Sequence, residues 1–128
     1  MVSKIPIAPH RVRRIPRQFS WVDHRLVRER RIDHCSHAAA ALYLFLVTVG
    51  DAKGMSYYAD ASIMAALSMD LATLRQAREN LIHADLIAWR KPLYQVLSLD
   101  EDKPPKSQPL AQPLSLKQIL EKTLGGAP

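Results

Sequence analysis

Four polar side chains share one side of a predicted helix over residues 71–84, and their types suit hydrogen bonding to the edges of DNA bases. They are Thr73, Arg75, Gln76 and Glu79. Arginine can form two hydrogen bonds to guanine, and glutamine can form two to adenine. Glu79 would repel phosphates, so we expect it to pair with Arg75 or to accept a hydrogen bond from cytosine. The alternative is an ordinary solvated helix face.

Three further cations extend this candidate surface. Arg78 flanks the polar face of the same helix, and we expect it to contact phosphate. Arg90 and Lys91 lie at the tip of a predicted β-hairpin. There they would contact the DNA backbone or the minor groove, and a merely solvated turn is the alternative.

The excess positive charge is confined to the N-terminal quarter of the chain. Residues 1–31 hold nine basic and two acidic side chains, a net charge of +7, whereas the remaining 97 residues carry −1. Because residues 1–19 contain Pro6, Pro9 and Pro16, we expect an arm without a long helix that orders on nucleic acid. Arginine dominates, and its planar guanidinium favours bidentate contacts with phosphate or guanine. The arm residues assigned to nucleic-acid binding are Arg11, Arg13, Arg14 and Arg17.

Two short helices are needed to position the polar face. Asp60 is the expected N-cap of the first helix, which turns Ile63 and Leu67 inward. Asp70 is the expected N-cap of the second helix. Opposite its polar face, apolar residues recur at helical spacing, with a small one where two helices approach closely. They are Leu74, Ala77 and Leu81. The pattern predicts a helix-turn-helix.

The stretch from Ser36 to Leu99 resembles the winged-helix DNA-binding family, particularly its bacterial replication-initiator, phage and regulator members. In that family the second helix ends in an apolar pair that begins a β-hairpin, and here the pair is Leu86-Ile87. The hairpin would span residues 88–97 around a basic, proline-containing tip, and an earlier strand would span Met55 to Tyr58. Asp85 occupies a position that is often glycine in the family, because the chain there turns through a left-handed conformation.

The resemblance implies a mainly α fold with a small β-hairpin, a winged helix-turn-helix over residues 20–99 that binds duplex DNA. Within it, Ser36 is expected to cap a helix over residues 38–49, which is apolar nearly all round and therefore buried on most sides. A shorter helix ending near Arg30 is expected to turn one apolar side inward. That side consists of Trp21, Val22, Leu26 and Val27.

The C-terminal part of the chain predicts a linker followed by a short amphipathic helix. Residues 100–114 are charged and rich in proline, which is typical of a linker. In residues 115–125, Ser115 and Gln118 have capping-box spacing. A helix of about ten residues is not stable alone in water, so we expect it to dock on its own domain, a second copy or another protein. The apolar stripe for that contact is Leu116, Ile119, Leu120 and Leu124.

Catalytic and metal-binding patterns are weak. His34, Cys35 and His37, with Asp23 and His24 earlier, lack the paired spacing of structural zinc sites. The sequence offers no recognisable oxyanion or substrate pocket, so we expect no enzymatic activity, no cofactor and no metal. The single cysteine suits a reducing cytosol, and the longest apolar run is about half a membrane span. We therefore expect a cytoplasmic protein without membrane contact.

Two other functions stay open. The winged helix could be a protein-interaction module of a replication, transposition or CRISPR-type nucleoprotein complex, with the arm on RNA or DNA. The protein could instead bind structured RNA, although we expect its aromatic residues to be needed mostly for the core. These are Trp21, Tyr57, Trp89 and Tyr94. A domain of about 80 residues is marginally stable without a partner, which is compatible with a homodimer.

Overall fold

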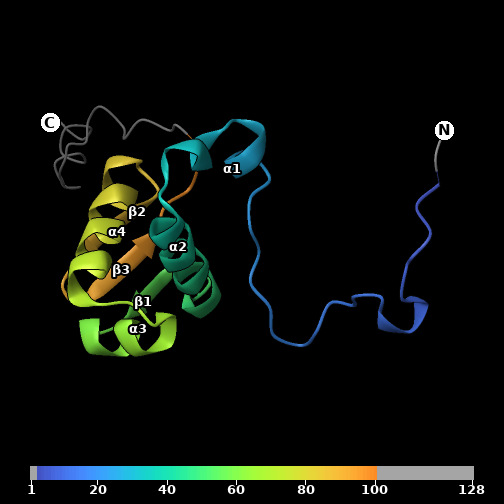
Figure 1. Ribbon diagram of the computed structural model, residues 1–128, viewed down its shortest axis with the longest axis horizontal. Helices are drawn as coiled ribbons and strands as arrows, with labels where there is room; N and C mark the ends of the chain where they lie inside the picture. Colours follow the sequence, from blue (N-terminus) through green and yellow to red (C-terminus); the bar gives the residue numbers. More distant parts are fainter. Residues whose placement is uncertain (1–2, 101–128) are drawn as a thin grey trace, which may run out of the picture.

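Helices and a small antiparallel sheet build the body of the protein in the computed structural model, which describes residues 3–100 (Figure 1). The described part contains four α-helices, two short 3-10 helices and three strands. In chain order they are η1 (Pro9–Arg11), α1 (Arg25–Arg28), η2 (Arg31–His34), α2 (His37–Val49), β1 (Met55–Tyr57), α3 (Asp60–Leu67), α4 (Leu71–His83), β2 (Ile87–Arg90) and β3 (Leu93–Val96). The fold is therefore mixed α/β. None of the helices of the described part is long and apolar enough to cross a membrane.

Helix α2 is the centre of the core. Ser36 caps it as predicted, because its hydroxyl accepts a hydrogen bond from the amide of Ala39 at 3.0 Å. Asn80 on α4 binds the same end, accepting from the Ser36 amide and donating to the His34 carbonyl at 2.7 and 2.9 Å. The side chains that α2 buries are Ala39, Leu42, Tyr43 and Leu46. Leu44 is 62% exposed, so one side of this apolar helix faces water.

Helices α3 and α4 are present where two helices joined by a short turn were predicted, but one of the two predicted caps is wrong. Asp70 caps α4, since its carboxylate accepts from the Thr73 amide at 2.8 Å. Helix α3 begins after Ala59, without a side-chain cap, and Asp60 is its first residue. The Asp60 carboxylate pairs with Arg78 instead of capping its own helix. The predicted inward stripe of α4 is confirmed, and its members are Leu74, Ala77 and Leu81.

The sheet has the strand order β1-β3-β2, and both pairings are antiparallel. Ile87 of β2 pairs with Val96 of β3, and Arg90 pairs with Leu93, which leaves a two-residue turn. The predicted hairpin and the earlier strand are therefore both present. Asp85 adopts the left-handed backbone conformation that was expected there, with a φ of 63°. Leu86 follows it into the core.

The predicted helix over residues 21–30 is much shorter than expected. Asp23 accepts hydrogen bonds from the backbone amide and the guanidinium of Arg25, so the helix starts only at Arg25 and ends at Arg28. Of its predicted apolar side, only Leu26 is buried. Trp21 is 72% exposed and Val27 is 71% exposed. The segment is therefore held to the body by one core side chain, Leu26, and by polar contacts such as the pair of Arg25 with Asp100.

Arg78 is the one charged residue buried in the core of the described region, with 5% of its surface exposed. One guanidinium nitrogen lies 2.9 Å from the Asp60 carboxylate and 2.9 Å from the Tyr94 hydroxyl. The guanidinium also stacks 3.9 Å from the ring centre of Trp89. Burial alone would lower the pKa of Arg78, but the bonds to Tyr94 and Asp60 outweigh it and raise that pKa. Four elements, α3, α4, β2 and β3, therefore meet at one permanent charge.

Arg78→Met is expected to lower the free energy of unfolding by about 2–4 kcal/mol, because Asp60 and Tyr94 lose their donor in the interior. The expected loss of unfolding free energy is smaller than for a fully buried ion pair, because the Asp60 side chain is 33% exposed. Urea titration measures the change. Arg75→Met on the outer face of α4 is the control and should change stability by less than about 0.5 kcal/mol. Equal unfolding free energies for the two variants would contradict the role given to Arg78.

Candidate nucleic-acid interface

The outer face of α4 presents most of the predicted base-reading side chains to solvent. Arg75, Gln76 and Glu79 are exposed, and Thr73 is half-buried at the start of the helix. The hydrogen bond from the Thr73 amide lowers the pKa of the Asp70 carboxyl, so the cap stays ionised at neutral pH. The cap fixes the first turn of α4, which is the turn that carries Thr73. The helix is thus divided into a buried apolar side and a free polar side.

Arg78 does not belong to this surface, and the prediction that it contacts phosphate is wrong. Its guanidinium is enclosed by Asp60, Tyr94 and Trp89. The sequence contained a sign of this position, because Arg78 lies four residues after Leu74 and three before Leu81. That spacing puts it on the inward stripe rather than on the outer face. The face therefore offers one arginine, Arg75.

The tip of the β2–β3 hairpin carries the next two predicted residues. Arg90 closes β2 and Lys91 begins the turn, and both side chains are exposed. Trp89, immediately before them, is held under the Arg78 guanidinium. Since Arg78 belongs to α4, this contact holds the part of β2 next to the tip against that helix. Two cations are thereby presented at a defined tip.

The arm carries the remaining predicted cations, and these have no partner within the described residues. Every residue from 3 to 22 is exposed, and η1 is the one regular element before α1. In contrast, Arg25, Arg30 and Arg31, where the arm meets the body, are each paired with a carboxylate. Arg25 contacts Asp23 at 2.7 Å and Asp100 at 2.8 Å. Charge available to an outside ligand is therefore concentrated in the arm, at Lys4, Arg11, Arg13, Arg14 and Arg17.

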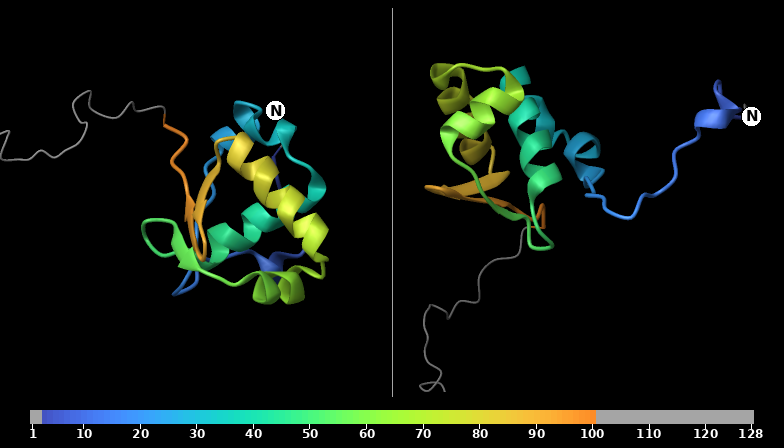
Figure 2. Two further views of the ribbon diagram at one scale, coloured as in Figure 1. Left: turned by 90° about the vertical axis from the view of Figure 1, so that its left-hand side faces the viewer. Right: turned by 90° about the horizontal axis from the view of Figure 1, so that it is seen from below.

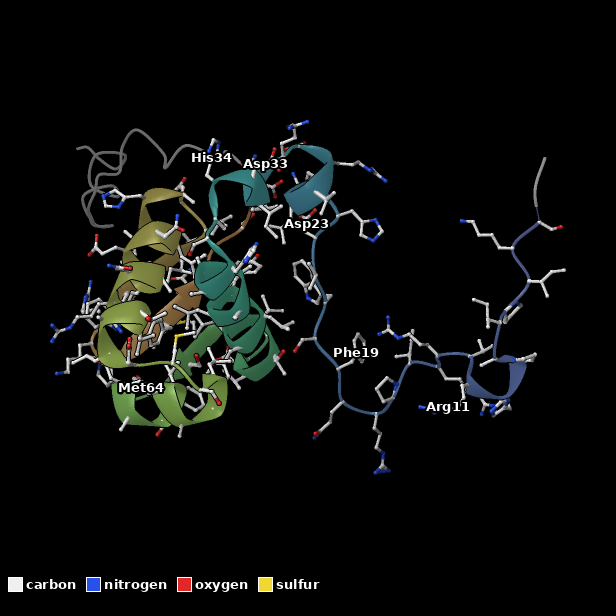
Figure 3. The ribbon with its side chains drawn as sticks, viewed as in Figure 1. Arg11, Phe19, Asp23, Asp33, His34 and Met64 are labelled. Atoms are coloured by element: carbon white, nitrogen blue, oxygen red, sulfur yellow. The ribbon has the colours of Figure 1, made fainter. Side chains whose placement is uncertain are left out.

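The arm and α4 are not brought together. The arm leaves the body beside α1 and α2, whereas α4 lies on the opposite side (Figure 1), and the view from below in Figure 2 agrees. Figure 3 shows Arg11 on the outer part of the arm, away from the body, and Phe19 nearer to the body. The predicted residues thus form two separate surfaces: the outer face of α4 with the hairpin tip, and the arm.

Sequence reasoning missed a hollow of about 520 Å³ where the arm joins the body. Phe19 and Trp21 line it from the arm, and Tyr43 and Val47 line it from α2. Trp21 had been assigned to the core, and so had Tyr57, which is also 72% exposed. Both assignments are wrong, while Tyr94 is buried and Trp89 is half-buried as expected. No local pattern would have revealed the hollow, because residues far apart in sequence form it.

Between residues 3 and 100, no three His, Cys, Asp or Glu side chains form a group that could hold a metal ion. Burial raises the pKa of the Cys35 thiol, which reduces its nucleophilicity at neutral pH. The linker over residues 101–114 and the apolar stripe of Leu116, Ile119, Leu120 and Leu124 lie outside the described residues.

Comparison with protein-family models, with curated proteins and with solved structures finds no match for this chain.

The ion pair at the base of the arm should make stability depend on pH. The side-chain hydrogen bonds from Arg25 lower the pKa of Asp23 from 3.8 to about 2. A lowered pKa in the folded state stabilises the fold above the ordinary pKa, and this contribution is lost as pH falls through 3.8 towards 2. We expect the wild-type protein to be more stable than Asp23→Asn at neutral pH, with the difference shrinking over that range. Thermal unfolding of both proteins across pH measures it, and a constant difference would contradict the pairing.

Proposed function

We propose that this protein binds nucleic acid, with duplex DNA held by the outer face of α4 and phosphates held by the arginines of the arm. The observation that carries the proposal is the division of α4. Leu74, Ala77 and Leu81 are buried, while Arg75 and Gln76 stay in water on the opposite side. A helix of this kind fits the major groove, where arginine and glutamine read base edges.

The order of elements supports the same function. Helices α3 and α4 are joined by a short turn, a hairpin follows α4, and β1 completes a sheet of order β1-β3-β2. This arrangement is compatible with a winged helix, in which the second helix of the pair enters the groove. Arg90 and Lys91 at the hairpin tip would then contact the neighbouring backbone or the minor groove. Such a protein would act as a regulator or as an accessory factor in replication or transposition.

A second candidate is a protein-interaction subunit of a larger nucleoprotein complex. The observation that favours it is apolar surface on the body outside α4: Val27 is 71% exposed and Leu44 is 62% exposed. Such side chains could contribute to a contact with another protein. Absence of duplex binding at about 50 mM salt, where phosphate contacts are strong, together with co-purification of another chain, would favour this candidate.

The arm predicts a strong salt dependence of binding. If its five cations neutralise about five phosphates, the logarithm of duplex affinity should fall with the logarithm of salt at a slope near −4 to −5. Replacing Arg11, Arg13, Arg14 and Arg17 with glutamine should flatten that slope by about 3 to 4. Fluorescence anisotropy between about 50 and 200 mM salt measures it. The same four positions as lysine form the control and should keep the slope, since the charge is retained. An unchanged slope in the glutamine variant would refute the role of the arm.

Arg75→Ala should distinguish groove reading from simple charge attraction. We expect it to weaken binding to duplexes selected from a random pool by roughly 1–3 kcal/mol and to weaken unselected duplex much less. Arg28→Ala is the matched control, because Arg28 is also an exposed helical arginine but lies on α1, away from α4. Equal losses for the two variants would mean that the α4 face does not read sequence.

A further inference from the structure

Two aromatic rings at the base of the arm lie in water. Phe19 is 63% exposed and Trp21 is 72% exposed, and both line the hollow of about 520 Å³ described above. Ser20 between them holds this segment in place, because its hydroxyl donates to the Thr48 carbonyl at the end of α2 at 3.2 Å. The rings therefore lie where the arm joins the body, and this hydrogen bond links their segment to α2. Exposed aromatic rings that line a common hollow are candidates for contact with a ligand.

The charge around these rings indicates the chemistry of that ligand. Residues 3–22 contain Lys4 and the four arm arginines but no acidic side chain. The nearest arginine, Arg17, precedes Phe19 by two residues, so a positive chain leads directly to the aromatic pair. A positively charged track beside exposed rings is the arrangement that binds single-stranded nucleic acid, since phosphates follow the charge and bases stack on the rings.

The carboxylates in the hollow do not oppose this ligand. Asp23 and Asp100 are both paired with Arg25, at 2.7 and 2.8 Å. Asp51 accepts hydrogen bonds from the backbone amides of Lys53 and Met55 at 2.8 and 2.9 Å. The hollow is lined by these three carboxylates and by two cations, Arg25 and Lys53, so it keeps a net charge of −1, which excludes phosphates and leaves acceptor oxygens for the N–H groups of a base. Phosphates would stay outside, along the arm.

The position of the arm argues against the duplex as its only ligand. The arm joins the body on the side opposite α4 (Figures 1 and 2), so a duplex that is held against α4 and contacts the arm arginines still leaves Phe19 and Trp21, at the base of the arm, uncovered. Bases inside a duplex are already stacked on one another and leave the two rings uncovered. Unpaired bases can cover them.

We propose that the arm and the hollow at its base bind single-stranded nucleic acid, with unpaired bases stacked on Phe19 and Trp21 and phosphates on the arm arginines. The inference rests on the part of the proposed function that assigns the arm to nucleic acid. It adds a second strand type and a second surface, distinct from the duplex surface of α4.

Binding to a labelled single-stranded DNA of about 20 nucleotides, longer than the 4–16 nucleotides of a typical single-strand site, provides the test. The full-length protein is titrated at about 50 mM salt, a condition in which phosphate contacts are strong. We expect Trp21→Ala to weaken binding about tenfold, because a stacked base is lost. Trp21→Phe keeps a ring and should lose much less. Val27→Ala is the control, since Val27 is 71% exposed but does not line the hollow, and its affinity should be unchanged.

Tryptophan fluorescence gives a direct readout of stacking. We expect single-stranded DNA to quench the emission of wild-type protein and to leave Trp21→Phe, which retains only Trp89, largely unquenched. The proposal is overturned if Trp21→Ala and Val27→Ala bind the single strand equally tightly. It is also overturned if Trp21 emission shifts to shorter wavelength as protein concentration rises without DNA, because a second copy would then cover the ring.

The duplex assay with Arg75→Ala, run in parallel, separates the two proposals. Loss of selected-duplex binding in Arg75→Ala with no effect of Trp21→Ala on single strands supports the α4 surface and refutes the stacking site. An effect of Trp21→Ala on single strands without duplex binding by the wild-type protein supports the stacking site and refutes the α4 proposal.

Discussion

The buried guanidinium of Arg78 is the interaction on which the rest of the fold depends. It joins Asp60 at the start of α3, Trp89 on β2 and Tyr94 on β3 to the middle of α4. A charge in the interior is tolerated only when its donors are satisfied, so each partner is constrained by the others. The helix pair and the hairpin cannot shift independently without exposing this charge to an apolar environment. One residue therefore fixes the relative position of the two elements that carry the exposed polar groups.

This constraint explains how a small domain presents a defined surface. Helix α4 is fixed at its start by the Asp70 cap, in its middle by Arg78, and near its end by Asn80, whose side chain binds the chain before α2. Because these contacts prevent rotation of the helix about its own axis, Arg75 and Gln76 remain exposed to solvent. Groove recognition requires this kind of rigidity, because a base edge is read only when the donor geometry is set in advance.

Local signals in the sequence predicted local structure well and long-range pairing poorly. The caps at Ser36 and Asp70, the apolar stripe of α4 and the hairpin after Asp85 follow from neighbours within a few residues, and all are present. Asp60 has the chemistry of a cap, but its carboxylate is used by Arg78, 18 residues later. Trp21 has the chemistry of a core residue, but Asp23 and Arg25 fix its segment through ion pairs that leave the ring outside. The error at Asp60 arises because a partner 18 residues away outweighs local propensity, whereas the error at Trp21 follows from an ion pair between residues only two positions apart.

Whether an arginine is paired within the protein says more about its availability to a ligand than the net charge of the chain does. Arg25 is paired with Asp23 and with Asp100, and its contact with Asp23 lowers the pKa of that carboxyl. The charge of Arg25 therefore holds the chain after β3 to the base of the arm. The arginines of the arm have no such role within residues 3–100. A cation that is exposed and internally unpaired has a field that reaches about 10 Å into solvent at ordinary salt, whereas a paired one has almost none. In the proposed binding mode, a nucleic acid approaching from solution would be attracted by the unpaired cations of the arm, and its unpaired bases would reach Phe19 and Trp21 where the arm joins the body.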